Sequence, residues 1–189
     1  MSAANEALCQ ACGACCAYSA DWPRFALETE AEIEAIPHAT WEVLRRAGSG
    51  GRDARKPIAI LAVGTMVQPS LGAADILAEA GTSATVVNCR YLKPHDEKVL
   101  SEILADHTNV LVVEEGTIVN GFGAHMAAVI GELDPAVRVV THGVPDDFID
   151  QAPRAIQLAR VALDASGIAR RATEAFGLDS ARGAQLRAI

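Results

Sequence analysis

Short apolar runs alternate with stretches of helical spacing from Pro57 onward. The run IAILAVG (58–64) is apolar up to its final Gly, as in a buried strand of a parallel sheet. The stretch DEKVLSEILADH (96–107) spaces its apolar side chains by three and four residues, with Asp96 at the N-cap position. Strands alternating with helices of this length predict right-handed βαβ crossovers. The predicted strands are 58–64, 83–89, 109–115 and 137–144, and the predicted helices are 69–81, 96–107, 121–133, 154–163 and 166–177.

This alternation predicts an α/β fold with three layers, α/β/α, around a mostly parallel sheet that helices cover on both faces. A short, Cys-rich and partly helical segment precedes it. We divide the chain into a segment at 1–47, a Gly-rich linker at 48–56, the α/β domain at 57–177 and a polar tail at 178–189.

The segment before the linker shows weaker helical signals. A capping-box pattern within ETEAEIEAIP (28–37) predicts a short helix that its final Pro ends. We expect a further helical turn through Trp41, Val43 and Leu44. The segment has too little apolar surface for a core of its own, so residues 1–50 are expected to contribute little to the folded unit.

Composition limits the classes of partner. Half of the 189 residues are hydrophobic, 4% are aromatic, and the formal net charge is −8. An acidic chain lacks the basic face that binding to nucleic-acid phosphates requires. We see no apolar run long enough to span a membrane and no signal peptide, and we therefore expect a cytoplasmic protein with reduced thiols.

Four of the five cysteines lie within the stretch CQACGACC (9–16). In a reducing compartment such clusters are more often metal or redox sites than disulfide frameworks. The stretch resembles the opening of small bacterial cysteine-cluster proteins that are thought to chelate zinc or iron, but the further cysteines of that family do not follow. Adjacent sulfurs also turn toward one ion with difficulty. The candidate metal ligands, for Zn or Fe, are Cys9, Cys12, Cys15 and Cys16.

Three motifs follow predicted strands in order: RYLKPHDEK (90–98), VVEEGTIVNGFGAHM (112–126) and GVPDDFIDQ (143–151). Together with ILAVGT (60–65) they resemble the C-terminal domain of the transketolase superfamily, and within it the 1-deoxy-D-xylulose-5-phosphate synthases. The resemblance covers roughly residues 57–177. One departure is His95, where that family usually has an aliphatic residue.

The resemblance implies a family that uses thiamine diphosphate and Mg²⁺ to join pyruvate and glyceraldehyde 3-phosphate. In that family the cofactor binds to two preceding domains, one of them through a Gly-Asp-Gly motif. The sequence contains no Gly-Asp-Gly. We therefore assign no catalytic and no cofactor-binding residue, and we expect this chain to be inactive alone.

The motifs also have structural interpretations. In NGFGAH (120–125) the glycines are more simply explained by a tight strand-to-helix turn than by an anion site. Glu114 and Glu115 point to opposite faces of a strand, so they are not an acid–base pair. One of them is expected to cap the next helix, to form a structural hydrogen bond or to contact another domain. Lys93 and Asp96 are expected to fix the loop before the next helix. His125 and His142 are interpreted as packed or surface residues, and Cys89 as a small buried hydrophobe.

Three hypotheses about function remain open. The leading one is a stand-alone or truncated transketolase-type C-terminal domain that serves packing and dimerisation. Its expected partner surface is an apolar patch around Val119, Phe122 and Phe148, which would form a homodimer or a complex with a thiamine-diphosphate-binding subunit. The alternatives are a metal- or redox-responsive binding protein that uses the cysteine cluster, and a nucleotide-binding module that uses the glycine turn.

Overall fold

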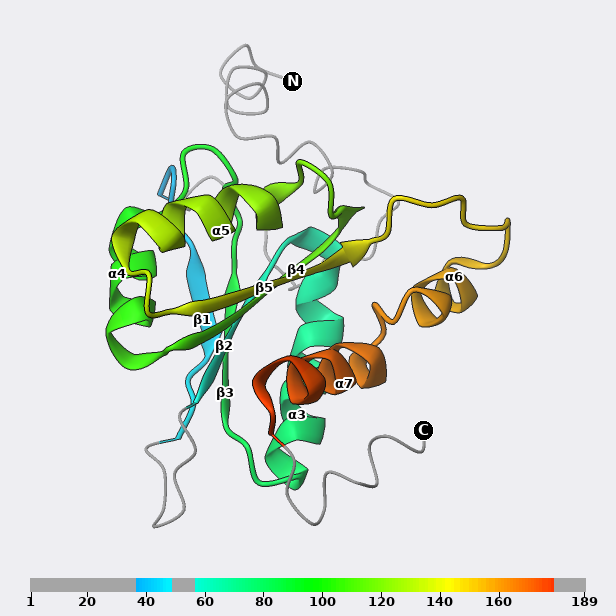
Figure 1. Ribbon diagram of the computed structural model, residues 1–189, viewed down its shortest axis with the longest axis horizontal. Helices are drawn as coiled ribbons and strands as arrows, with labels where there is room; N and C mark the ends of the chain where they lie inside the picture. Colours follow the sequence, from blue (N-terminus) through cyan, green and yellow to red (C-terminus); the bar gives the residue numbers. More distant parts are fainter. Residues whose placement is uncertain (1–36, 49–56, 179–189) are drawn as a thin grey trace.

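Five strands form a sheet in the order β1-β3-β2-β4-β5. The computed structural model describes residues 37–48 and 57–178 (Figure 1). The strands β2, β3, β4 and β5 are parallel, and β1 runs antiparallel to β3 at one edge. The strands are β1 (Glu42–Arg45), β2 (Ile58–Ala62), β3 (Ala84–Asn88), β4 (Asn109–Thr117) and β5 (Arg138–Val144). The helices are η2 (Gly64–Met66), α3 (Val67–Glu79), α4 (Glu97–Asp106), α5 (Phe122–Leu133), α6 (Arg154–Arg160) and α7 (Ala165–Phe176).

Helices cover both faces of this sheet, which confirms the predicted three-layer α/β/α class. In Figure 1, α4 and α5 lie on one side of the strands, and α3 and α7 lie on the other. Strand β2 is buried at all five positions because it has a neighbour on each side and helices above and below. A central strand of this kind gives a continuous apolar run without alternation, and this is the pattern that IAILA shows.

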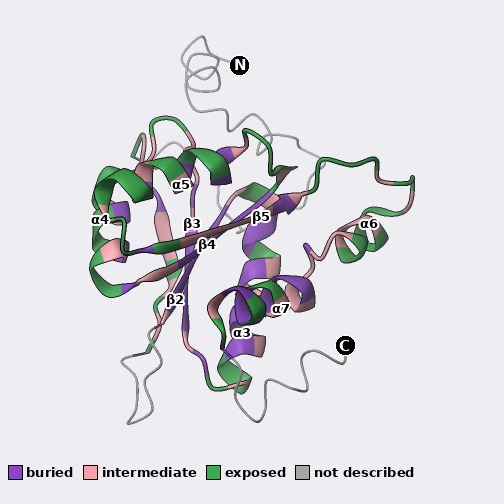
Figure 2. Cartoon of the chain, in the orientation of Figure 1, coloured by how far each residue is buried: buried purple, intermediate pink, exposed green. Residues whose placement is uncertain are grey.

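The two faces of β2 belong to separate apolar cores. Ile58 and Ile60 face the core that α3 and α7 close, whereas Ala59 and Leu61 face the core that α4 and α5 close. This division follows from the period of two along a strand. Figure 2 shows the buried residues concentrated along the strands and on α3 and α7, while α6 has no buried residue and lies apart from the sheet.

The predicted helix ends are marked by caps. Asp96 accepts a hydrogen bond from the backbone N of Val99 at 3.0 Å, which confirms it as the N-cap of α4. Asp164 caps α7 in the same way through the N of Gly167, and Gly177 ends α7 with a φ of 63°. This left-handed conformation is one that glycine adopts at little cost. Helix α7 therefore ends at Phe176, with Gly177 as its C-cap.

Strand β1 corrects the sequence interpretation. The helical turn predicted through Trp41, Val43 and Leu44 was wrong, because residues 42–45 form a strand paired with β3. Trp41 is buried in the core beneath α4 and α5, and its indole Nε1 donates to the carbonyl of Tyr91 at 2.7 Å. The expectation that residues 1–50 contribute little is therefore wrong for residues 41–48. The helix predicted within 28–37 lies almost wholly outside the described residues.

Within residues 37–48 and 57–178, no helix combines the length and apolarity that crossing a bilayer requires. The proposed boundaries of the linker and the tail remain predictions.

Replacement of Trp41 tests how much β1 contributes. Trp41→Ala should lower the free energy of unfolding by about 3–5 kcal/mol, the range for a large aromatic removed from a core. Leu44→Ala is the matched control on the same strand, because Leu44 is 39% exposed and should cost less than about 1 kcal/mol. Urea titration monitored by circular dichroism measures both. Equal, small effects would show that β1 adds little to the fold.

Candidate functional site

Glu114, Glu115 and Asp96 lie at or just beyond the carboxyl ends of parallel strands. Open α/β sheets place ligands at this end, because loops and helix N-termini converge there. We call this the carboxyl edge. The three sequence motifs all reach it: residues 90–98 follow β3, residues 114–123 leave β4, and residues 143–151 leave β5.

Glu114 is the central residue of the carboxyl edge. Its side chain is buried, and its Oε1 accepts a hydrogen bond from the N of Gly123 at 2.7 Å while Oε2 accepts one from the N of Phe122 at 3.0 Å. A carboxylate at a helix N-terminus satisfies orphan N–H groups and interacts favourably with the helix dipole. Glu114 therefore caps α5, which is one of the roles that the sequence predicted for this pair of glutamates.

The glycines around Glu114 make room for its carboxylate. A Cβ at Gly121 would lie 2.3 Å from the carbonyl O of Thr117 and 2.5 Å from Oε1 of Glu114. A Cβ at Gly143, on β5, would lie 2.7 Å from the carbonyl O of Gly116. The predicted close packing is present at both glycines of the turn, because a Cβ at Gly123 would also lie 3.0 Å from the Cγ2 of Thr141. The N-terminus of α5 already holds the protein's own anion, so nothing here supports the nucleotide-binding module.

Glu115 points to the opposite face of β4, as the alternation of a strand requires. Its carboxylate accepts hydrogen bonds from Thr65 and from the guanidinium of Arg154, whose Nε lies 3.0 Å from Oε1. Partial burial acts to raise the pKa of Glu115, but the hydrogen bonds from Arg154 and Thr65 and the charge of Arg154 outweigh it and lower the pKa below its ordinary value. This ion pair joins β4 to the start of α6.

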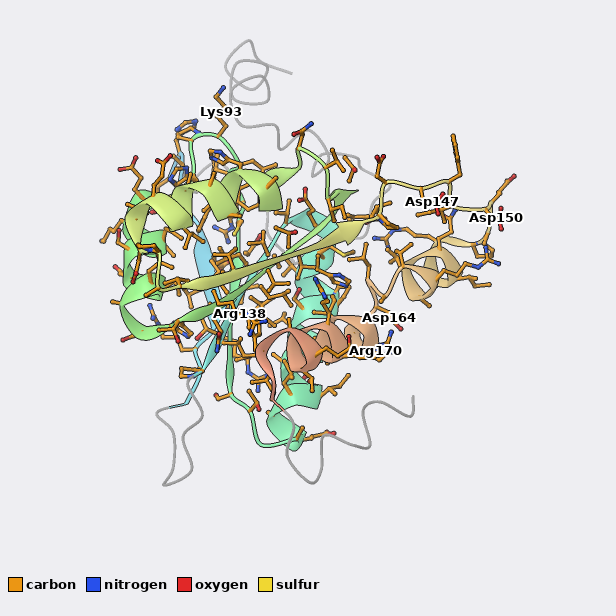
Figure 3. All side chains as sticks on the ribbon, in the orientation of Figure 1. Lys93, Arg138, Asp147, Asp150, Asp164 and Arg170 are labelled. Carbon is orange, nitrogen blue, oxygen red and sulfur yellow. The ribbon has the colours of Figure 1, made fainter. Side chains whose placement is uncertain are left out.

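The loop between β3 and α4 is tied to β1. Asp96 accepts from the backbone N of Trp41 at 2.8 Å as well as from α4, so one carboxylate joins segments 55 residues apart. Lys93 is exposed and extends away from the fold (Figure 3). The predicted role in fixing the loop is confirmed for Asp96, whereas Lys93 has no hydrogen bond or ion pair with another described residue.

Comparison with known proteins identifies this arrangement. A family model described as "Transketolase, C-terminal domain" matches residues 51–168. The chain belongs to this family. The 1-deoxy-D-xylulose-5-phosphate synthase of Synechococcus sp. (strain JA-2-3B'a(2-13)) is 41% identical over 143 residues, which cover 76% of this chain and 21% of that enzyme. The corresponding enzyme of Cupriavidus taiwanensis is 38% identical over 149 residues, covering 79% of this chain and 22% of the enzyme.

Solved structures agree with this family. A structure described as "Split gene transketolase, inactive beta4 tetramer" superposes with a TM-score of 0.66 at 30% identity, covering 77% of this chain and 45% of that chain. The matched region corresponds to about a fifth of the length of the two 1-deoxy-D-xylulose-5-phosphate synthases named above.

The structure describes one of the five cysteines named in the sequence analysis, Cys89. Cys9, Cys12, Cys15 and Cys16 lie outside the described residues, and the metal site remains a prediction. Among the residues that the structure describes, no group of three or more His, Cys, Asp and Glu side chains is placed to hold a metal ion. Cys89 is buried and free, as predicted, and burial together with the charge of Asp96 raises the pKa of its thiol.

The apolar patch predicted at the carboxyl edge is only partly present. Phe122 is 7% exposed and packs against Trp41 with a ring-centroid distance of 6.1 Å, so its assignment to the surface was wrong. Its backbone N is bound by Glu114, which turns the first residue of α5 into the core. Val119, Ile118 and Phe148 are exposed, and Phe148 is fully so. These three residues are named the exposed apolar patch below.

A glycine pair tests the packing around Glu114. Gly121→Ala should destabilise the protein by about 1–3 kcal/mol, since its Cβ would overlap the Thr117 carbonyl and the Glu114 carboxylate. Gly131→Ala, within the same helix, meets nothing within 4 Å and should stabilise by about 0.5–1 kcal/mol. Thermal or urea denaturation separates the two. If both variants changed the free energy of unfolding in the same direction, helix propensity and not the space needed by Glu114 would determine the effect at Gly121.

Proposed function

We propose that this chain serves as a stand-alone or truncated C-terminal domain of a 1-deoxy-D-xylulose-5-phosphate synthase-like, thiamine-diphosphate-dependent transferase. Its role is packing and dimerisation beside a catalytic core, and it is not catalytic alone. We place it in the cytoplasm, on the composition and thiol arguments from the sequence.

The length of the match supports this proposal. The identity of 41% to a 1-deoxy-D-xylulose-5-phosphate synthase is confined to about a fifth of that enzyme. The sequence holds no Gly-Asp-Gly motif, and the polar residues at the carboxyl edge bind one another or the ends of their own helices. Glu114, Glu115 and Asp96 are therefore engaged in structure, and none of them is poised as an acid or base.

The observation that carries the docking role is the exposed apolar patch. Ile118 and Val119 follow β4, and Phe148 lies in the segment between β5 and α6, so two loops at one edge of the sheet present apolar side chains. A fully exposed Phe is costly in water and favours burial against a partner. The related split-gene transketolase, described as a tetramer of β subunits, supports assembly as the setting for such a domain.

Cofactor binding tests the catalytic part of the proposal. Isothermal calorimetry of the purified chain with thiamine diphosphate and Mg²⁺ should show no binding in the micromolar range. The reason is that the sequence contains no Gly-Asp-Gly motif, through which the related enzymes hold the diphosphate. Pyruvate and glyceraldehyde 3-phosphate should likewise not be consumed. Micromolar cofactor binding, or turnover by the chain alone, would contradict the proposal.

Sedimentation tests the docking part. The chain should sediment as a homodimer at micromolar concentration, or as a complex when a thiamine-diphosphate-binding subunit is supplied. Phe148→Asp should weaken the association at least about tenfold, as loss of an aromatic anchor does. Leu133→Asp is the control, since Leu133 is exposed at the opposite end of α5 and should leave association unchanged. A monomer under both conditions, or equal effects of the two variants, would argue against this surface.

The cysteine cluster supports a second proposal, a metal- or redox-responsive binding protein with the α/β domain as scaffold. Its motivating observation is the spacing of Cys9, Cys12, Cys15 and Cys16. Zn or Fe that copurifies with the chain and is lost when these four cysteines are replaced by Ser would favour this role over the first.

A further inference from the structure

Two histidines meet beside a hollow at the carboxyl edge. His95 lies in the loop before α4, and His125 lies in the first turns of α5, 30 residues further along the chain. Their ring centroids are 5.7 Å apart, with an interplanar angle of 62°. The hollow measures about 350 Å³ and is lined by both rings together with Leu92, Lys93 and Pro94. Two separate elements therefore bring a pair of imidazoles to one concave site.

The ring nitrogens of this pair are unengaged within the described part of the chain. Neither the His95 ring nor the His125 ring has a hydrogen bond or an ion pair there, and the contact between the two rings is an aromatic one. Two other histidines differ. His107 uses both nitrogens, Nδ1 with the carbonyl of Ile103 and Nε2 with Thr85, and His142 uses Nε2 with the carbonyl of Ala162. His38 also has unengaged ring nitrogens, but its ring contacts Tyr91. Among the described residues, His95 and His125 are the two imidazoles with unengaged nitrogens that contact each other.

The backbone beneath the two rings is firmly held. The residue after His95 is Asp96, which binds both Trp41 and Val99 through its carboxylate. The backbone N of His125 donates to the carbonyl of Gly121, in the turn that Glu114 caps. The ring centroids of Trp41 and His95 are 6.4 Å apart. The backbone positions of the two histidines are therefore fixed by contacts that do not involve their own rings.

The geometry points to a binding site for one divalent transition-metal ion. We propose that His95 and His125 coordinate an ion of the Zn²⁺, Ni²⁺ or Cu²⁺ class, with water completing the coordination. Imidazole nitrogens bind such ions at about 2.0–2.1 Å, which places the two ring centroids roughly 5 Å apart. The observed separation of 5.7 Å is close to this value. Imidazole ligands select these ions over Mg²⁺ and Ca²⁺, which prefer oxygen.

The surrounding charge is compatible with a cation. Lys93 lines the hollow, and its side chain extends outward from the fold (Figure 3). The formal net charge of −8 attracts cations to the molecule as a whole. The proposed ligands are different residues from the four cysteines, and the proposal does not depend on the proposed function.

The test uses the full-length chain with Cys9, Cys12, Cys15 and Cys16 replaced by Ser, which removes the other candidate ligands. Calorimetric titration with NiCl₂ should give a one-to-one isotherm, tighter still with Cu²⁺ and absent with MgCl₂. His95→Gln and His125→Gln should each weaken Ni²⁺ binding at least about tenfold, since even changes of residues behind the ligands commonly cost that much. The electron paramagnetic resonance spectrum of bound Cu²⁺ should show coupling to two imidazole nitrogens.

His38→Gln is the matched control. His38 is exposed nearby, with its ring 5.2 Å from that of Tyr91, and its replacement should leave the affinity for Ni²⁺ unchanged. Thermal denaturation of each variant checks that the fold is retained. An affinity that falls less than tenfold in folded His95→Gln or His125→Gln, an equal loss in His38→Gln, or binding of inorganic phosphate in place of Ni²⁺ would overturn the assignment.

Discussion

The buried carboxylate of Glu114 is the interaction on which the carboxyl edge depends. It leaves β4 where the register with β5 shifts between Val113 and Thr117, and both of its oxygens bind N–H groups of α5. Glycines at 121 and 143 are required because any Cβ there would occupy space that this carboxylate or a neighbouring carbonyl already fills. A single charged group thus ties β4 to the first residues of α5.

The carboxylate of Asp96 plays a similar role at the start of α4. Asp96 caps α4 and binds the backbone of Trp41, which brings β1 against β3 and places the indole in the core. The two carboxylates, Glu114 and Asp96, hold helices α5 and α4 on one face, and Trp41 packs against Phe122 between them. Polar residues that lie where an enzyme of this architecture would bind a ligand are here occupied in holding helices. The proposal that the domain serves packing and not catalysis rests on this arrangement.

Two sets of side chains at the carboxyl edge are not engaged in holding the fold together, and the proposed binding roles rest on them. The apolar side chains of Ile118, Val119 and Phe148 are exposed, and a pair of imidazoles meets beside a hollow. The first calls for a protein surface, because exposed aliphatic and aromatic side chains gain from leaving water. The second calls for a metal ion, because unpaired imidazole nitrogens are ligands of transition metals. The three apolar residues and His95 lie on loops, where binding groups are commonly placed, and His125 lies in the first turn of α5.

The sequence alone determined the features that arise from neighbouring residues. The apolar run of β2, the spacing in α4 and the cap at Asp96 are local, and so is the division of Glu114 and Glu115 between two faces. The tertiary structure decided what depends on distant partners. The four residues of β1 carry no clear period and became a strand through pairing with β3, more than 40 positions away. Phe122 was buried because Glu114 and Trp41 hold the first turn of α5 against the core. His95 and His125 came together only because the sheet sets β3 and β4 on either side of β2. Hydrophobic periodicity and helix caps depend on residues that are close together in the sequence. Contacts between distant residues depend on the order of the strands in the sheet, which no single stretch of sequence encodes.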